Sequence, residues 1–244
     1  VLVAIMHANN EIGTIQPIKK IGEICKGNNI LFFVDACQTF GKLEINVKDM
    51  KIDLLAATAH KLYGPKGIGF LYVCQKNPKV ILEMQMDGGG HERGYRSGTL
   101  PVPLIVGFSK ATEICIQKRE SEYHSLGKFR DLLLNGIKRK HADIILNGNN
   151  KNGLSHNLNL CFPNLEAETI IMKMTGIACS AGSACTSNSL EPSHVIKALG
   201  YNNEMAHSAI RFSVGRFTTK TEIEQAIFEI NSAVSFLKSK RKER

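Results

Sequence analysis

Val1-Leu-Val-Ala-Ile-Met6 is a continuous apolar run, and Ile30-Leu-Phe-Phe-Val34 is a second run of the same kind. Such runs are typical of parallel strands buried in a sheet. Between them, residues 17–27 have the apolar spacing of an amphipathic helix that begins at a proline and ends at a glycine. Residues 54–57 and 67–73 predict two further strands. Strands alternating with a helix indicate a doubly wound α/β fold.

The later part of the chain has a different character. A long helical stretch runs from about residue 103 to 140, and Gly127 predicts a break in it. Residues 144–146 predict a short strand, and residues 156–162 alternate between apolar and polar, as a half-buried strand does. The final helix is predicted to start at the capping box of Thr219 and Glu222. We therefore expect two domains, an α/β domain over residues 1–105 and a smaller α+β domain over 106–244.

Composition excludes several classes of protein. Hydrophobic residues make up 43% of the 244 residues and charged residues 22%, which is ordinary globular usage and excludes a disordered or collagen-like chain. The longest apolar runs are far shorter than a membrane span, so no membrane association is expected. Because the chain starts at Val1 without an initiator Met, we expect it to be part of a longer polypeptide.

The net charge of +9 raises the question of nucleic-acid binding. The last seven residues, 238–244, contain five positive charges and one negative charge, so much of the excess lies in a short tail. The remainder is spread over more than two hundred residues. A solvated basic tail explains the charge, and nucleic acid is not an expected partner.

Seven cysteines are scattered through the chain without a Cys-x-x-Cys pair or a zinc-finger spacing, so no metal site is predicted. An odd, scattered set indicates a reducing compartment in which most thiols are buried. Ser180-Ala-Gly-Ser-Ala-Cys-Thr-Ser187 differs from the other cysteine contexts, because small residues surround Cys185. Buried structural cysteines usually lie among Leu, Val or Ile, so this context favours a reactive thiol.

Charged residues at predicted strand ends leave alternatives open. Asp35 either caps the turn that follows its strand or holds the protonated nitrogen of a pyridinium ring. Lys61, in a segment leading to a glycine-rich turn, is either solvated or forms a Schiff base with an aldehyde cofactor. Arg211, within a strand-like run, makes either an internal salt bridge or a clamp on a substrate carboxylate.

Seven stretches of the sequence form an ordered set of motifs, namely His7-Ala-Asn-Asn-Glu-Ile-Gly13, Val34-Asp-Ala-x-Gln38, His60-Lys-x-Tyr-Gly-Pro-Lys-Gly67, Gly88-Gly-Gly-His-Glu-Arg-Gly-x-Arg-Ser-Gly-Thr99, Gly182-Ser-Ala-Cys-Thr-Ser187, Leu190-Glu-Pro-Ser193 and Ile210-Arg-Phe-Ser-x-Gly-Arg216. In this order they resemble the group I cysteine desulfurases of the NifS/IscS type, within the class V aminotransferases of fold type I. The resemblance implies that this chain has part of the large cofactor-binding domain, with a mostly parallel sheet, followed by the small α+β domain.

The resemblance implies a site for pyridoxal 5'-phosphate. Lys61 would carry the cofactor and then act as acid and base, and Asp35 would pair with its pyridinium nitrogen. Gln38 would hydrogen-bond the phenolic oxygen of the ring. Thr58 and His60 would bind the phosphate; the family usually has Ser where Thr58 stands, which keeps the hydroxyl. His60 would also belong to the catalytic residues.

Four more residues complete the implied site. Thr99 would reach the phosphate across the interface of a homodimer. Asn10 and Arg211 would fix the carboxylate of the substrate. Cys185 would attack the substrate sulfur and become a persulfide. The resemblance implies no resident metal ion, although Cys185 would pass sulfur to, or transiently ligate, a cluster on a scaffold protein.

The implied reaction is removal of sulfur from L-cysteine, giving L-alanine and a persulfide for iron–sulfur cluster assembly and tRNA thiolation. Its implied partner is a scaffold protein of the IscU type or another sulfur acceptor. The compartment would be the cytoplasm in a bacterium, and the mitochondrion or a mitochondrion-derived organelle in a eukaryote. Family members have about another third of the chain before this start, so an incomplete pocket and an inactive fragment are expected.

Two other functions are compatible with parts of the sequence. Another class V enzyme, such as a selenocysteine lyase or a transaminase, would share the cofactor residues. A transaminase needs no nucleophilic cysteine, so the context of Cys185 speaks against it. A truncated, non-catalytic binding module would explain the missing segment, but it would have no use for Lys61, Asp35 and Cys185 together.

Overall fold

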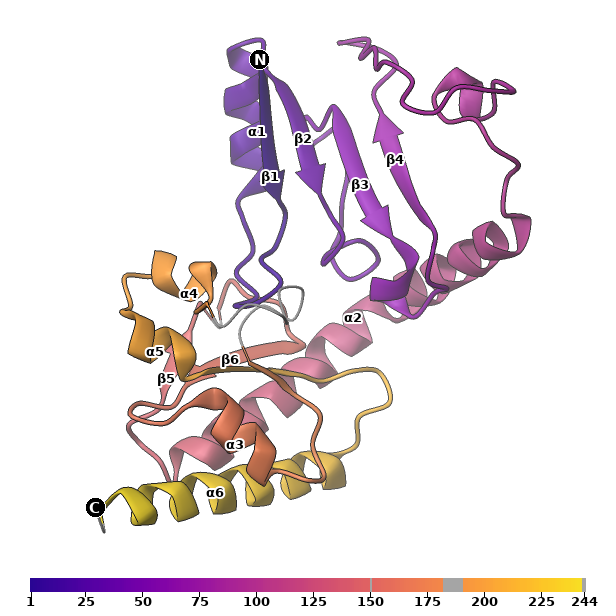
Figure 1. Cartoon of the computed structure of the whole chain (residues 1–244). Coiled ribbons are helices and arrows are strands. Elements are labelled where there is room, and N and C mark those ends of the chain that lie inside the picture. The colour runs from indigo at the N-terminus through magenta and orange to yellow at the C-terminus, as the bar shows by residue number, and fades with distance from the viewer. Residues whose placement is uncertain (150, 182–190, 243–244) are drawn as a thin grey trace. The chain divides into compact units, whose positions relative to one another are not determined.

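The computed structural model describes residues 1–149, 151–181 and 191–242, and it contains two compact units (Figure 1). Unit 1 comprises Val1–Ala8 and Gln16–Arg119, and unit 2 comprises Asn9–Ile15 and Glu120–Arg244. This division differs from the boundary expected near residue 105. A single helix runs through that position, and the loop Asn9–Ile15 belongs to the second unit because it is hydrogen-bonded there.

Unit 1 is built around a four-stranded sheet. Its elements are β1 (Leu2–Met6), α1 (Ile18–Gly27), β2 (Leu31–Asp35), β3 (Leu54–Thr58), the 3-10 helix η1 (Ala59–Leu62), β4 (Gly69–Val73), the 3-10 helix η2 (Glu92–Gly94) and the first part of α2 (Val102–Lys138). The strand order is β1-β2-β3-β4 (Figure 1). The first three strands are parallel and β4 is antiparallel to β3, so the predicted mostly parallel α/β sheet is confirmed.

The two faces of this sheet differ in burial. One face packs against α1, where Phe32 and Val34 are fully buried with Ile18. The strand register places Met6 and Leu71 on the opposite face, where they are 43% and 50% exposed. The expectation of a buried first strand was therefore wrong. Val3 and Ile5 pack on the side of α1, whereas Met6 lies on the opposite face, so an apolar sequence alone does not bury both faces of this strand.

This exposed apolar face leads to a prediction about the 244-residue chain in isolation. We expect it to bind a hydrophobic dye and to self-associate at micromolar concentration, because exposed apolar side chains on one face, such as Leu2, Met6 and Leu71, promote association. Leu71→Lys should lower both the dye fluorescence and the apparent mass in light scattering. Ile24→Lys serves as the control, since Ile24 is also exposed but lies on α1. A monodisperse chain that binds no dye would contradict this expectation.

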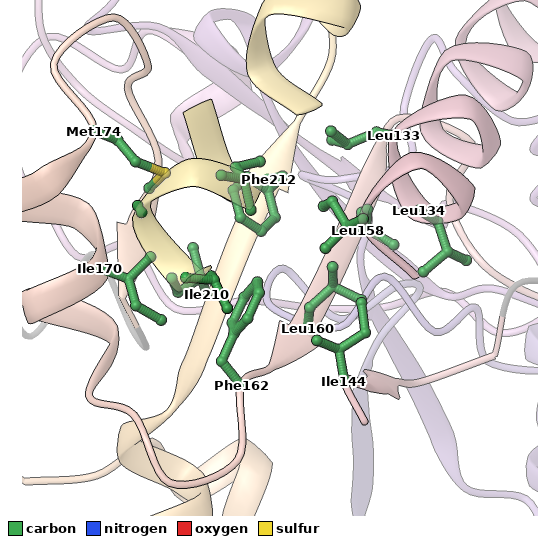
Figure 2. Close-up of a cluster of buried hydrophobic side chains, with 14 of the residues drawn as sticks. Leu133, Leu134, Ile144, Leu158, Leu160, Phe162, Ile170, Met174, Ile210 and Phe212 are labelled. Carbon is green, nitrogen blue, oxygen red and sulfur yellow. The ribbon is translucent and has the colours of Figure 1, made fainter. Parts of the chain in front are cut away.

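Unit 2 is built around an antiparallel sheet. Its elements are the second part of α2, β5 (Ile145–Asn147), β6 (Asn157–Cys161), α3 (Ala167–Lys173), β7 (Ser180–Ala181), α4 (His194–Ala198), α5 (Asn203–His207), β8 (Ala209–Ser213) and α6 (Lys220–Lys242). The strand order is β5-β6-β8-β7. One face packs against α2, α3 and α6, and Figure 2 shows side chains from the sheet and from two of these helices, among them Leu134, Leu160, Phe162, Ile170 and Ile210.

The second face of this sheet is covered too. Cys161 and Ala209 pack there against Ile196 of α4 and Ala206 of α5. Every residue of β6 is therefore buried, and the expected half-buried strand was wrong. Alternation of polar and apolar residues predicts that one face of the strand is exposed. Here the polar residues are Asn157 and Asn159, which are buried and hydrogen-bonded to the carbonyl of Glu11.

Helix α2 is continuous over 37 residues, so the break expected at Gly127 was also wrong. A glycine inside a helix costs about 1 kcal/mol relative to alanine. Leu126 and Leu133 are buried on either side of it, and their packing outweighs that cost. Gly136 allows α2 to pack closely against α6, because a Cβ at this position would lie 2.5 Å from the side chain of Ile227.

Helix α6 begins as predicted from the capping box. The Thr219 hydroxyl accepts the backbone N–H of Glu222 at 3.3 Å, and the Glu222 carboxylate accepts the backbone N–H of Thr219 at 2.7 Å. The carboxylate of Glu222 accepts from both the backbone N–H and the hydroxyl of Thr219, and these two bonds lower its pKa below its ordinary value. Within the described residues, no helix combines the length and apolar character that a membrane crossing requires.

Candidate active site

Polar side chains gather in unit 1 at the carboxyl ends of β2 and β3. Asp35 is the last residue of β2 and lies opposite Ala56 of β3 in the register of this parallel pair. Lys61 follows β3 on the short helix η1, and its side chain is exposed. Ligands of doubly wound α/β proteins bind at this edge of the sheet. The two predicted key residues of unit 1 therefore lie at the expected edge, Asp35 at the end of β2 and Lys61 just after the end of the neighbouring strand β3.

Asp35 caps the turn that follows β2. Its Oδ1 accepts the backbone N–H of Cys37 at 2.9 Å. This is the capping role that was one of the two alternatives, and it leaves the second alternative open because a carboxylate can accept at both oxygens. Burial, followed by the carboxylate of Asp35, raises the pKa of the Cys37 thiol to about 12, while the charge of Lys61 acts in the opposite direction. The Cys37 thiol thus lies within electrostatic range of both the Asp35 carboxylate and the Lys61 amine.

Thr58 and His60 form a second polar pair at the same edge. The Thr58 hydroxyl donates to the carbonyl of Ile68 at 3.2 Å and lies 2.9 Å from Nδ1 of His60. Which of the two groups donates in the second contact depends on the tautomer of His60. A hydroxyl and a ring N–H are both donors that an anion can accept.

His7, which directly follows β1, stabilises the same edge of the sheet. No function was predicted for this residue from the sequence. Its backbone N–H donates to the carbonyl of Asp35 at 2.8 Å, and its Nδ1 lies 3.0 Å from the hydroxyl of Thr39. Both contacts fix the turn that contains Gln38. Burial lowers the pKa of His7 from 6.5 to about 4, so the ring is neutral at physiological pH.

The lowered pKa of His7 predicts a pH dependence of stability. The unfolded chain binds a proton at His7 below pH 6.5 and the folded chain only near pH 4, so stability falls as the pH falls through this window. Between pH 7.5 and pH 5 we expect a loss of about 2 kcal/mol in the free energy of unfolding. Urea unfolding followed by circular dichroism measures it. His7→Gln should remove this part of the dependence; an unchanged dependence would contradict the assignment.

Unit 2 brings Asn10 and Arg211 together. The loop Asn9–Ile15 belongs to this unit, and Arg211 lies on β8. Nη1 of Arg211 donates to the backbone carbonyl of Asn10 at 2.9 Å. The guanidinium has five N–H groups, so this bond leaves donors for a carboxylate. The two residues predicted to bind one carboxylate are thus neighbours, although they are 201 positions apart.

The predicted site residues thus fall into four groups. Unit 1 places five of them at one edge of its sheet: Asp35, Gln38, Thr58, His60 and Lys61. Unit 2 joins Asn10 to Arg211. Thr99 is exposed before α2, and no hydrogen bond among the described residues joins it to the other groups. Cys185 lies outside the described residues. The described part of the chain contains no cluster of three or more His, Cys, Asp or Glu side chains that could hold a metal ion.

The donor set at the edge of unit 1 fits pyridoxal phosphate. An exposed primary amine suits an aldehyde, and a carboxylate at the end of the adjacent strand suits a protonated ring nitrogen. A hydroxyl and an imidazole suit a phosphate. The fold and this donor set define a class of α/β proteins whose reactive groups stand at the carboxyl ends of parallel strands.

The family is shown by comparison with known proteins. The family model of the class V aminotransferases matches residues 1–226, and the chain belongs to this family. A cysteine desulfurase IscS of Histophilus somni (strain 129Pt) is 54% identical over 238 residues, and one of Vibrio vulnificus (strain YJ016) is 52% identical over 238 residues. These alignments cover 98% of this chain and 58% of each relative.

Solved structures confirm the fold. A NifS-like protein superposes with a TM-score of 0.86 at 33% identity, covering 96% of this chain and 61% of that protein. SspA in complex with cysteine superposes with a TM-score of 0.71 at 35% identity, over 89% of this chain and 60% of the other. The chain therefore spans about three fifths of the proteins it resembles.

Proposed function

We propose that the protein to which this chain belongs is a cysteine desulfurase with pyridoxal phosphate as cofactor. The observation that carries the proposal is the placement of the Lys61 amine and the Asp35 carboxylate at the ends of adjacent strands, in a chain of the class V family. More than half identity to cysteine desulfurases named IscS supports L-cysteine as the substrate. L-Alanine and a persulfide would be the products.

Each residue of unit 1 has a specific part in this reaction. Lys61 would hold the cofactor, then remove the α-proton of the substrate and return a proton during turnover. When bound, the cofactor supplies an electron sink for the carbanion that forms at the α-carbon. Asp35 would keep the ring nitrogen protonated, and Gln38 would donate to the phenolic oxygen. Thr58 and His60, already joined at 2.9 Å, would bind the phosphate.

Unit 2 would supply the substrate clamp and the nucleophile. Asn10 and Arg211 would bind the substrate carboxylate. The Cys185 thiolate would form a bond to the substrate sulfur as the bond between that sulfur and the β-carbon breaks. The electron pair of the broken bond would remain with the carbon, which a proton then converts to the methyl group of alanine. Sulfur would leave the enzyme by transfer from this persulfide to an acceptor thiol.

The partners proposed for the whole protein follow from this product. A persulfide would serve an iron–sulfur scaffold protein of the IscU type and enzymes of tRNA thiolation. Thr99 would act in a homodimer, by reaching the phosphate bound to the other copy. The compartment would be the cytoplasm in a bacterium and the mitochondrion or a related organelle in a eukaryote.

Product analysis tests the proposal on protein expressed from the complete reading frame. With L-cysteine and a reducing thiol, we expect alanine and sulfide in equal amounts. A keto acid without sulfide would indicate a transaminase, and turnover confined to L-selenocysteine a selenocysteine lyase. A binding module would turn over neither substrate. If RNA were instead retained in a salt-dependent way, and lost on deletion of residues 238–244, the binding module would replace the desulfurase proposal.

A further inference from the structure

Glu11 and Ser193 lie in two of the stretches that carry the family resemblance, but neither has an assigned function. Glu11 is only 1% exposed and Ser193 6% exposed. The Ser193 hydroxyl donates to Oε2 of Glu11 at 2.6 Å, across 182 positions of sequence. A buried carboxylate is costly unless it is hydrogen-bonded, so this short bond stabilises a group that the fold would otherwise exclude.

The backbone of Glu11 is held as firmly as its side chain. Its N–H donates to Oδ1 of Asn9 at 2.8 Å. Its carbonyl accepts two hydrogen bonds, from the side-chain amides of Asn157 and Asn159 of β6, each at 3.2 Å. These asparagines are the buried polar residues of β6. Two hydrogen bonds from β6 therefore fix the position of the Glu11 backbone relative to the sheet of unit 2.

This network determines the position of the residue next to it. Asn10 lies between Glu11 and Asn9, and the backbone of Asn9 is itself hydrogen-bonded to Gly13 and Thr14. The carbonyl of Asn10 accepts from Arg211. A shift of the Glu11 backbone would move that carbonyl and therefore the guanidinium that donates to it. The two groups that would bind the substrate carboxylate share this support.

We propose that Glu11 is a positioning residue for the binding of the α-carboxylate of an amino acid, with Ser193 as the partner that fixes its side chain. The inference rests on the proposed function, because it assumes that Asn10 and Arg211 bind the substrate. Glu11 touches neither substrate nor cofactor. It acts by holding the main chain that aligns Asn10 with Arg211, and the ligand class it serves is an amine with an adjacent carboxylate.

The test compares two ligands that differ only in the carboxylate. L-Alanine is the product of the proposed reaction, and ethylamine is the same molecule without the carboxylate. Dissociation constants for both are measured from the change in visible absorbance of the cofactor-loaded protein from the complete reading frame. For Glu11→Ala we expect at least a tenfold weaker affinity for L-alanine and an affinity for ethylamine within twofold of the wild type.

Two further variants strengthen the comparison. Glu11→Gln should recover most of the affinity for L-alanine, since an amide oxygen can still accept from Ser193. Ser193→Ala should weaken the affinity for L-alanine more than the affinity for ethylamine, as Glu11→Ala does. This variant provides the test if Glu11→Ala does not fold. Ser208→Ala is the matched control, because this hydroxyl is also buried in unit 2 but donates to the carbonyl of Met205 at 2.7 Å.

The outcomes separate the inference from the proposed function. Equal weakening of both ligands in Glu11→Ala or Ser193→Ala, or the same loss of selectivity in Ser208→Ala, would show a merely structural role and overturn the inference. An unchanged ratio of the affinities for L-alanine and ethylamine in both Glu11→Ala and Ser193→Ala would also overturn the inference. If neither ligand changes the absorbance of the wild type, the proposed cofactor chemistry itself fails.

Discussion

Lys61→Ala is expected to abolish the visible absorbance of the bound cofactor and to reduce turnover of L-cysteine by at least about a thousandfold. The lysine would be both the point of attachment and the group that moves the α-proton, and alanine can do neither. Its place after β3, beside the end of β2, is why this lysine is expected to react. Absorbance spectra, borohydride trapping and alanine assays on the protein from the complete reading frame measure both losses.

Lys66→Ala provides the control for this experiment. Lys66 is another exposed lysine in the same segment, five residues after Lys61 but beyond the end of η1. We expect this variant to keep the trapped label and turnover within about threefold of the wild type. Peptide mapping after trapping in the wild type should place the label on Lys61. A label on Lys66 would show that the attachment residue was assigned incorrectly.

Much of the fold could be predicted because local patterns determine it. The apolar runs at residues 30–34 and 54–57 form parallel strands, and the capping box of Thr219 and Glu222 begins the last helix. The errors arose where tertiary packing overrides a local signal. Gly127 does not break α2, since the flanking leucines are buried, and β6 is covered on both faces by helices that lie elsewhere in the sequence.

The same difference between local patterns and tertiary contacts decides which residues of the candidate site could be predicted. Asp35 and Lys61 could be identified because Asp35 ends a recognisable strand and Lys61 follows another. The partner of Arg211 could not, because it is a backbone carbonyl 201 positions away that no side-chain pattern reveals. The contact between Glu11 and Ser193 could not be predicted either, because the two residues are 182 positions apart. Their presence in two family motifs was nevertheless a signal that they have a function. Cys185 lies outside the described residues, so its role remains a prediction from sequence.

Cys185→Ser should separate sulfur transfer from the chemistry of the cofactor. Lys61 and Asp35 are unchanged in this variant, so the protein should still bind the cofactor and still change its absorbance when L-cysteine is added. Formation of the persulfide should cease, and release of alanine and sulfide should fall by at least about a hundredfold, because a hydroxyl is a far poorer nucleophile toward sulfur. Mass spectrometry of the cysteine-treated wild type should find the additional sulfur on Cys185.

Cys179 is the matched control, since it lies six residues upstream and the structure describes it. It is half-buried against the core of unit 2, and burial raises the pKa of its thiol to about 11. At neutral pH this thiol is protonated and therefore a weak nucleophile. We expect Cys179→Ser to keep turnover within about threefold of the wild type. An additional sulfur on Cys179, together with an active Cys185→Ser variant, would move the nucleophile to Cys179 and leave the proposed functions of Lys61 and Asp35 unaffected.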